Sequence, residues 1–258
     1  MTSGSESATT SSSAIAIAVN APERAEQSVR DKYRNPQATL EFFGLKEDMT
    51  VVEVSPGGGW YTSILNPVVK DSGKLIAAHF HVYEGAPGYY QRSLDGFNKK
   101  IASNPLFSGI EVTEFHPTKA LDIAPEGSAD MVLTFRNLHN WYMSDGDQGV
   151  ENSFKAFHKA LKKGGVLGVV DHRMPENLDQ EENKRSGYIK QSYAIAAAEK
   201  AGFKLVAASE INANPKDTAQ HPRGVWTLPP RLALGDENKD KYIAIGESDR
   251  MTLKFVKE

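Results

Sequence analysis

The chain of 258 residues contains no cysteine. Disulfides, cysteine-ligated zinc sites and cysteine nucleophiles are therefore excluded. Long apolar runs are also missing, since none approaches the roughly 20 residues that a membrane-spanning helix requires. Neither sign of charge dominates, because the formal net charge is −3, so the composition offers no electrostatic basis for binding nucleic acid or an anionic membrane. We therefore expect the partner to be a small molecule.

The length fits one α/β domain with an insertion. Residues 1–21 are rich in Ser, Thr and Ala, which predicts disorder, and residues 22–258 form the single expected domain. The apolar run at 14–19 is too short for a signal-peptide core and no basic stretch precedes it, so we expect a cytoplasmic protein; a native secretory leader removed from this N-terminus stays an alternative. Residues 212–250 read as an irregular insertion, which is a lid, a contact in a homodimer or a disordered segment.

Residues 51–61 are the most informative stretch, because a β-branched apolar run breaks into three consecutive glycines and a helical pattern at 61–69 follows. Strand, glycine turn and helix form the nucleotide-binding corner of an open α/β sheet. The dinucleotide fingerprint would need a glycine where Thr62 stands, and no phosphate-binding Lys follows the turn. The remaining pattern is Glu53-x-Ser55-x-Gly57-x-Gly59. Taken alone, it also fits a tight turn that binds nothing.

The rest of the chain alternates between strand and helix patterns. Strands are expected at 74–78, 109–114, 129–135, 166–171, 204–211 and 251–256, and helices at 25–34, after Asn35-Pro36, at 150–161 and at 189–201. This order predicts an α/β, Rossmann-like sheet of seven mostly parallel strands, with the last strand antiparallel and helices on both faces. The last two strands are joined by a connection that we expect to be non-helical.

Polar side chains follow the fourth and fifth strands at the edge where ligands of α/β sheets bind. Asn137 and His139 come after the fourth strand and His172 after the fifth, so we expect all three near the chemistry, with either histidine as a general base. His139 as a merely structural histidine is the alternative. His79 and His81 form an H-x-H pair without a third ligand nearby, and no metal site is expected there.

Taken together, these stretches resemble class I S-adenosylmethionine (SAM) methyltransferases. The resemblance rests on Arg34-Asn35-Pro36, on the Glu53-to-Tyr61 motif with Ser-Pro before the glycines, on residues 136–141 and on Asp171-His172-Arg173. It is strongest to a subfamily of predicted methyltransferases whose substrate is not established, in which a missing acid after the second strand is habitual. It implies an enzyme that uses SAM and methylates a small-molecule acceptor. By this resemblance the cofactor would contact Tyr33, Glu53, Ser55, Gly57, Gly58, Gly59, Tyr61, His79, Arg136 and Asn137.

Three other interpretations stay open at this point. A protein that binds SAM or S-adenosylhomocysteine without turnover would share the same corner. An O-methyltransferase assisted by Mg²⁺ would use Asp171 with Asn137 and His172. A nicotinamide-dependent oxidoreductase would need the glycine that Thr62 replaces.

Overall fold

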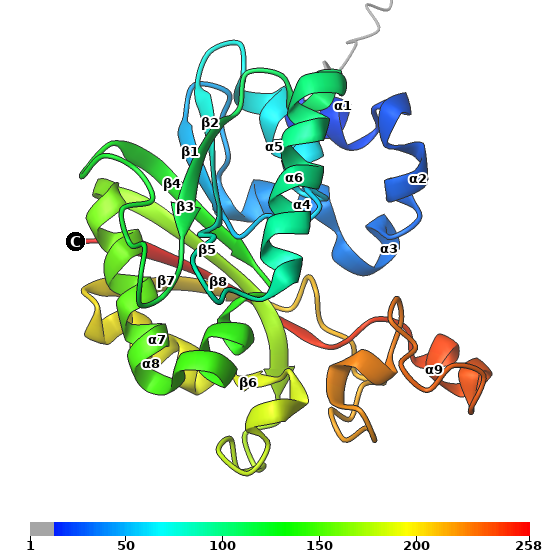
Figure 1. Cartoon of the computed structure of the whole chain (residues 1–258). Coiled ribbons are helices and arrows are strands. Elements are labelled where there is room, and N and C mark those ends of the chain that lie inside the picture. Colours follow the sequence, from blue (N-terminus) through cyan, green and yellow to red (C-terminus); the bar gives the residue numbers. More distant parts are fainter. Residues whose placement is uncertain (1–12) are drawn as a thin grey trace, which may run out of the picture.

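A computed structural model describes residues 13–258 and contains one mixed β-sheet (Figure 1). Its main path runs β3-β2-β1-β4-β5-β8-β7, and the short strand β6 pairs with β5 beyond it. The strands are β1 (Thr50–Val54), β2 (Lys74–Phe80), β3 (Glu111–Phe115), β4 (Ala129–Phe135), β5 (Leu161–Met174), β6 (Ile189–Lys190), β7 (Phe203–Ser209) and β8 (Arg250–Lys257). Only β8 runs antiparallel to both of its neighbours. The predicted fold class is therefore confirmed.

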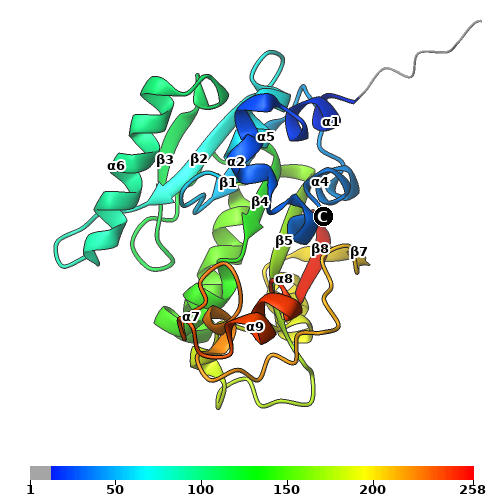
Figure 2. The ribbon, with the colours of Figure 1, turned by 90° about the vertical axis from the view of Figure 1, so that its right-hand side faces the viewer.

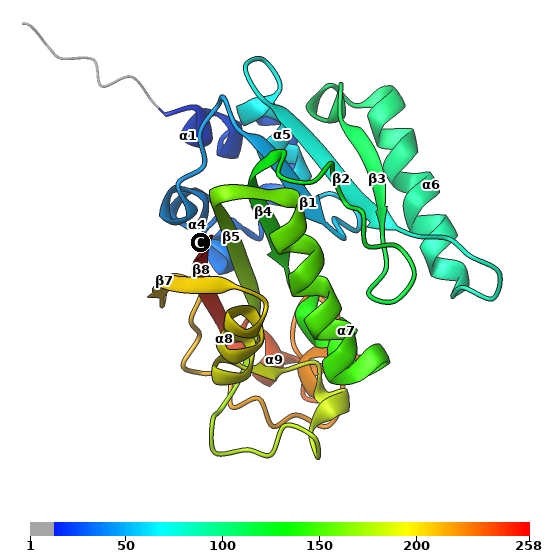
Figure 3. The ribbon, with the colours of Figure 1, turned by 90° about the vertical axis from the view of Figure 1, so that its left-hand side faces the viewer.

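Helices cover both faces of the sheet because neighbouring residues of a strand point to opposite sides. Val51 of β1 packs with α1, α4, α5 and α6, whereas Val52 packs with α7 and α8. Figure 3 shows α7 and α8 in front of the central strands, and Figure 2 shows the N-terminal helices beside α5. The helices are α1 (Ala14–Val19), α2 (Ala25–Ser28), α3 (Asp31–Arg34), α4 (Pro36–Phe43), α5 (Thr62–Val69), α6 (Gly88–Ser103), α7 (Leu138–Ala160), α8 (Gln191–Lys200) and α9 (Lys239–Ile245).

The N-terminal part differs from the expectation. Residues 1–12 of the predicted disordered segment lie outside the described residues, but residues 14–19 form α1, which buries Ile15 and Val19 in the core. The helix expected at 25–34 is divided into α2 and α3. Asn35 is a left-handed C-cap of α3 and its side chain donates to the Ile211 carbonyl, whereas Pro36 opens α4 as predicted.

Three other elements correct the sequence interpretation. Helix α6 was not expected, because only one of its 16 residues, Phe97, is buried and the apolar periodicity is correspondingly weak. Helix α7 begins at Leu138 rather than at 150, and it is interrupted at Gly146. The connection between β7 and β8 contains α9 and a short 3-10 turn, Gly224–Thr227, so it is not wholly non-helical.

Arg173 of β5 holds the two ends of that connection together. Its guanidinium donates two bonds of 2.8 Å to Glu210, directly after β7, and bonds of 2.9 and 3.0 Å to Asp249, directly before β8. Bidentate arginine–carboxylate pairs of this kind have a defined geometry. The connection, residues 210–249, is therefore fixed at both ends to the carboxyl end of β5. None of the helices in residues 13–258 combines the length and the apolar character needed to cross a bilayer.

Candidate functional site

The carboxyl ends of β1 and β4 carry two residues in the left-handed backbone region. Ser55 has φ 51° and Arg136 has φ 62°, a conformation that is rare for residues other than glycine. Each donates a backbone hydrogen bond to the neighbouring strand. The distance is 2.8 Å from Ser55 N to the Ala78 carbonyl and 2.7 Å from Arg136 N to the Val170 carbonyl. Such backbone strain concentrates at functional sites. The backbone therefore turns sharply at the ends of β1 and β4, and the residues that follow both strands lie at the same rim of the sheet.

The glycine turn uses its glycines in two different ways. Gly57 has φ 58° and a Cβ built on it would meet nothing within 4 Å, so the backbone is open to approach from outside. Gly59 has φ 81°, and a Cβ there would lie 2.5 Å from the ring of Phe107. Gly57 therefore leaves room for a ligand, whereas Gly59 lets the turn pack on the protein.

Glu53 lies below the turn and is 2% exposed. Its Oε2 accepts a hydrogen bond of 2.5 Å from Thr62 Oγ1. Burial raises the pKa of Glu53 to about 7, against the opposing effects of the Thr62 hydrogen bond and of Arg136. Glu53 is thus a buried acid that titrates near neutral pH at the base of the turn.

His79 ends β2 and is fully buried. Its Nδ1 accepts a hydrogen bond of 2.8 Å from Phe80 N, so the proton lies on Nε2, which donates to the Gly57 carbonyl at 3.1 Å. Both ring nitrogens are therefore engaged by backbone. In this structure His79 supports the glycine turn from within.

Tyr61 and Arg136 line a small cavity at the corner, which we call the corner cavity. Its volume is about 20 Å³ and its other walls include Glu53, Ser55 and Asn137. The ring of Tyr61 is stacked on Phe135 with centroids 3.6 Å apart. The corner itself is therefore nearly filled by aromatic rings.

A larger cavity of about 500 Å³ begins on one side of this corner, and Ser55 and Asn137 line both. We call it the aromatic cavity, because its walls carry Phe80, Tyr89, Tyr90, Phe115 and Trp141. Phe80 and Tyr90 are stacked in parallel, 4.2 Å between centroids. The side chain of Asn137 fixes the boundary by donating to the Val54 carbonyl at 3.1 Å. This cavity has the size and the lining of a site for a flat heterocycle.

A second cavity of about 230 Å³ lies on the other side, and Arg136 lines both it and the corner. We call it the arginine cavity. Its walls include Arg30, Arg34, Arg136, Arg231, Arg250, His172, Ser248 and Trp226. Trp226 and Arg231 come from the connection of residues 210–249, so this segment covers the cavity. The arginines come from four separate parts of the sequence, so the sequence analysis named Arg34 and Arg136 but could not predict that the five lie together.

His139 lies beside the arginine cavity in contact with two residues of its wall. Its Nδ1 donates to Asp171 Oδ1 over 2.7 Å, and its ring centroid is 4.9 Å from that of His172 and 6.4 Å from that of Trp226. Because a carboxylate only accepts, this bond places the proton on Nδ1 and leaves Nε2 as the basic nitrogen. The hydrogen bond to Asp171 therefore fixes the orientation and the tautomer of His139.

His172 has a different environment. Its Nδ1 forms a hydrogen bond of 2.5 Å with Ser248 Oγ. Burial lowers the pKa of His172 well below its usual range, and the neighbouring His139 and Arg250 act in the same direction. His172 is therefore neutral near pH 7 and presents a polar but uncharged edge to the cavity.

The structure brings most of the predicted site residues together at this rim. Glu53, Ser55, Tyr61, Arg136 and Asn137 line the corner, and His139 and His172 lie next to the arginine cavity. Tyr33 lies apart: its ring packs against Gly246 and its carbonyl accepts from Arg250. Gly58 packs near Lys100, whose ammonium donates to the Gly58 carbonyl. The aromatic residues of the larger cavity, and Arg231 and Arg250, were missed.

His139, Asp171 and His172 also offer ligand atoms within 4.8 Å of one another. Asp171 already accepts three hydrogen bonds, from His139 Nδ1, from His139 N at 3.2 Å and from His172 N at 2.7 Å. This bonding orients the carboxylate toward His139. Asn137, the third residue of the Mg²⁺ interpretation, donates instead to the end of β1.

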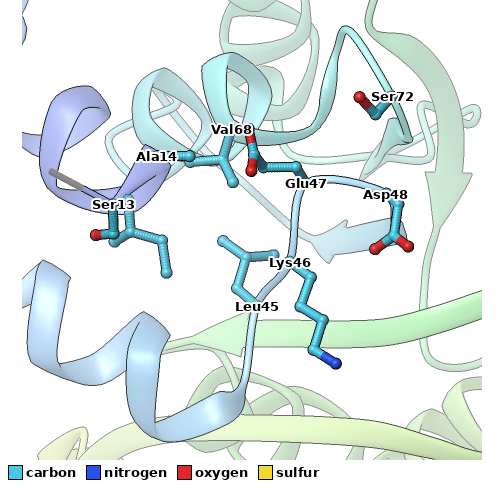
Figure 4. A pocket seen from close by; sticks show the side chains of 9 residues that line it. Ser13, Ala14, Leu45, Lys46, Glu47, Asp48, Val68 and Ser72 are labelled. Carbon is cyan, nitrogen blue, oxygen red and sulfur yellow. The ribbon is translucent and has the colours of Figure 1, made fainter. Parts of the chain in front are cut away.

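Another cavity, of about 580 Å³, lies at the opposite end of β1 (Figure 4). Its walls are Ser13, Ala14 and Ile15, the loop 45–48 that precedes β1, Val68 and Ser72. Ligands of open α/β sheets bind at the carboxyl ends of the strands. This cavity therefore takes no part in the site described above.

Comparison with known proteins identifies solved structures that share this fold. No family model and no curated protein matches this chain. A crystal structure described as a SAM dependent methyltransferase from Aquifex aeolicus matches with a TM-score of 0.57 and 18% sequence identity, over 88% of this chain and 91% of that one. A putative sarcosine dimethylglycine methyltransferase from Galdieria sulphuraria matches with a TM-score of 0.57 and 14% identity, over 93% and 90% of the two chains.

The [4+2]-cyclase SpnF matches equally well, with a TM-score of 0.58 and 12% identity over 95% of this chain and 96% of that one. At such low identities the likeness shows the fold alone. The chain has the fold of SAM-dependent methyltransferases, and the cyclase shows that the same fold also accompanies another described activity.

Proposed function

We propose that the protein is a SAM-dependent methyltransferase that acts on a small-molecule acceptor. The observation that carries the proposal is the arrangement around the end of β4. An open glycine turn and an aromatic cavity lie on one side, and an oriented histidine–aspartate pair lies beside a covered cavity on the other. The shared fold supports the same conclusion.

The residues fit SAM in size and chemistry. The aromatic cavity, at about 500 Å³, is within the range of cofactor sites and offers rings on which adenine can stack. Asn137 and Ser55 stand where this cavity meets the turn. Arg136 would supply a cation for the methionine carboxylate at the corner if the stacked rings of Tyr61 and Phe135 move, because the corner cavity has a volume of only about 20 Å³. A carboxylate for the ribose is missing from the end of β2, and we assign that contact to Asn137.

SAM supplies a methyl group already activated on a sulfonium, so the protein's own task is to position an acceptor and to remove its proton. Nε2 of His139 would take the acceptor's proton, and the sulfonium would give up the methyl group with S-adenosylhomocysteine as the leaving group. Asp171 then stabilises the imidazolium through the Nδ1 hydrogen bond. The connection of residues 210–249 would limit the access of water, because Trp226 lines the arginine cavity and lies beside His139, with ring centroids 6.4 Å apart.

A Mg²⁺-assisted O-methyltransferase is the second candidate. His139, Asp171 and His172 offer ligand atoms within 4.8 Å of one another, but two of the three are imidazole nitrogens, whereas Mg²⁺ prefers oxygen ligands, so the grouping gives this candidate little support. Activity that is lost in EDTA and restored by Mg²⁺ would select this mechanism. Activity unchanged by EDTA selects the histidine base.

The first experiment measures melting temperature with SAM, S-adenosylhomocysteine and NAD, since a ligand that binds only the folded protein raises it. We expect SAM and S-adenosylhomocysteine to stabilise the protein and NAD to have no effect. Tyr90→Ala should weaken binding of S-adenosylhomocysteine about tenfold, which corresponds to loss of one stacking partner. Tyr83→Ala is the matched control, because Tyr83 is also partly exposed and lines none of the corner, aromatic and arginine cavities.

Stabilisation by NAD alone, or equal effects of the two tyrosine variants, would contradict the proposal. Binding of S-adenosylhomocysteine without methyl transfer to a broad panel of acceptors would instead identify a non-catalytic binding protein.

A further inference from the structure

The arginine cavity holds more positive charge than its surroundings neutralise. Five arginines line it, and the carboxylate that pairs with them is Glu247. Glu247 is 2.6 Å from Arg30, contacts Arg250 through a short bond and is 3.7 Å from Arg34. Within residues 13–258, Arg136 and Arg231 form no ion pair. One carboxylate is therefore shared among three cations, and two further cations have none.

Buried hydrogen-bond donors in this cavity are unused. Arg34 is 3% exposed and its Nε and Nη1 have no hydrogen-bond partner, and Arg250 is 2% exposed with its Nε unpartnered. Buried polar groups without partners are rare and costly, more so when charged. Burial and the repulsion from Arg136 and Arg30 lower the pKa of Arg34, which expresses the same cost. An anion in the cavity would relieve this repulsion.

A purely structural role gives a buried arginine its own carboxylate. Arg24 is fully buried and, like Arg250, has an unpartnered Nε, but its guanidinium is paired with Asp31 through bonds of 2.9 and 3.3 Å and also donates to the Val19 carbonyl. Arg34 instead lacks partners for both Nε and Nη1 and shares Glu247 with two other arginines. The cofactor carboxylate does not account for the cluster either. Only Arg136 among the five arginines borders the corner cavity beside the glycine turn. Four arginines thus remain for another ligand.

We propose that the methyl acceptor is an anion, with a carboxylate or phosphate group that binds in the arginine cavity to Arg34, Arg231 and Arg250. This inference rests on the proposed methyltransferase function. The cavity of about 230 Å³ admits an anionic group with a small body. His172 borders the cavity and His139 adjoins His172, so an acceptor anchored there has its reacting atom near the base. Planar guanidinium groups suit both carboxylates and phosphates.

The test first measures anion binding without any turnover. Inorganic phosphate and malonate are titrated at constant ionic strength, with chloride as the balancing salt, and the dissociation constant is measured by calorimetry. We expect one or both probes to bind, and the tighter one indicates the group on the acceptor. Arg231→Gln should weaken that binding at least tenfold. Arg223→Gln, an exposed arginine of the same connection that does not line the cavity, is the matched control.

Arg231 is exposed, so its replacement should leave folding intact, and Arg34→Gln is the second variant for the buried part of the site. Absence of binding by both probes, or equal weakening by the Arg231 and Arg223 variants, would overturn the proposal. S-adenosylhomocysteine binding is measured on the same samples. If the protein binds an anion but does not bind S-adenosylhomocysteine, the methyltransferase function is rejected and the anion site is retained.

The final step compares acceptors. Small carboxylic acids and phosphate monoesters are offered with SAM beside their neutral methyl esters or amides. We expect at least tenfold higher kcat/KM for the anions, with that preference lost in Arg231→Gln and kept in Arg223→Gln. Preference for the neutral compounds would overturn the proposal even if the probes bind.

Discussion

The aromatic cavity and the arginine cavity lie on opposite sides of the end of β4, and they differ in almost every property. One has a volume of about 500 Å³ and is lined mainly by rings, while the other has about 230 Å³ and is lined by five arginines. Two consecutive residues mark the division, because Asn137 lines the first cavity and Arg136 the second. The end of β4 thus separates a cavity whose rings can stack on a ligand from a cavity whose arginines can bind an anion.

This difference fits the proposal that the rim serves two ligands. Stacked rings suit a flat heterocycle, and a cluster of arginines suits an anion. The separation should therefore be visible in variants, since a change on one side should leave affinity on the other side unaltered.

The largest effect is expected from His139→Asn on the arginine side. Asparagine keeps a donor toward Asp171 but removes the basic nitrogen, so methyl transfer should fall by about 10²–10⁴-fold. The affinity for S-adenosylhomocysteine should stay within twofold of the wild type, because His139 does not line the aromatic cavity. Single-turnover rates and calorimetry measure the two quantities. A variant that turns over normally would remove His139 from the chemistry, and one that loses the cofactor would break the proposed separation.

The next effect compares the two glycines of the turn. Gly59→Ala should lower the free energy of unfolding by about 3 kcal/mol, because the new methyl collides with Phe107 and the backbone is left-handed. Gly57→Ala meets open space and should cost only about 1 kcal/mol, yet weaken S-adenosylhomocysteine binding at least tenfold. Denaturant unfolding and calorimetry distinguish these outcomes. Equal loss of stability in both variants would contradict the division of roles.

The last effect concerns Glu53 and pH, and it appears only over a limited pH range. Its pKa is raised from 4.5 to about 7 by burial, so the folded protein binds a proton that the unfolded chain releases between these values. Stability should therefore fall as pH rises from about 4.5 to 7, by up to about 3 kcal/mol. Glu53→Gln should flatten this part of the profile. Parallel profiles for the two proteins would show that Glu53 does not titrate in this range.

The sequence predicted the sheet well because its strands are short apolar runs separated by glycine turns. The order of elements and the antiparallel last strand followed from that pattern. Helix α6 was not predicted because most of its side chains are exposed to solvent. Helix α1 was not predicted because its six residues follow a segment rich in Ser, Thr and Ala. Local composition cannot report burial that depends on a distant helix such as α5.

The site was predictable only where its residues are consecutive in the chain. Glu53 and the glycines, and Asn137 with His139, stand in short stretches that end strands. The arginine cavity instead joins α3, the end of β4, the start of β8 and the connection before it. No spacing rule relates Arg34 to Arg231 and Arg250, because only the sheet order brings them together. The engagement of His79 by backbone on both sides likewise depends on the folded turn.

The reversed direction of β8 means that β7 ends and β8 begins at the same edge of the sheet, and Arg173 joins those two points. The segment over the arginine cavity is consequently a loop whose two ends are held together by Arg173 at the edge of the sheet. Its length and composition can change at a cost that grows only slowly with the number of residues, and the sheet need not adjust. Relatives that keep the base while exchanging the loop would hold the same transfer chemistry and accept different molecules.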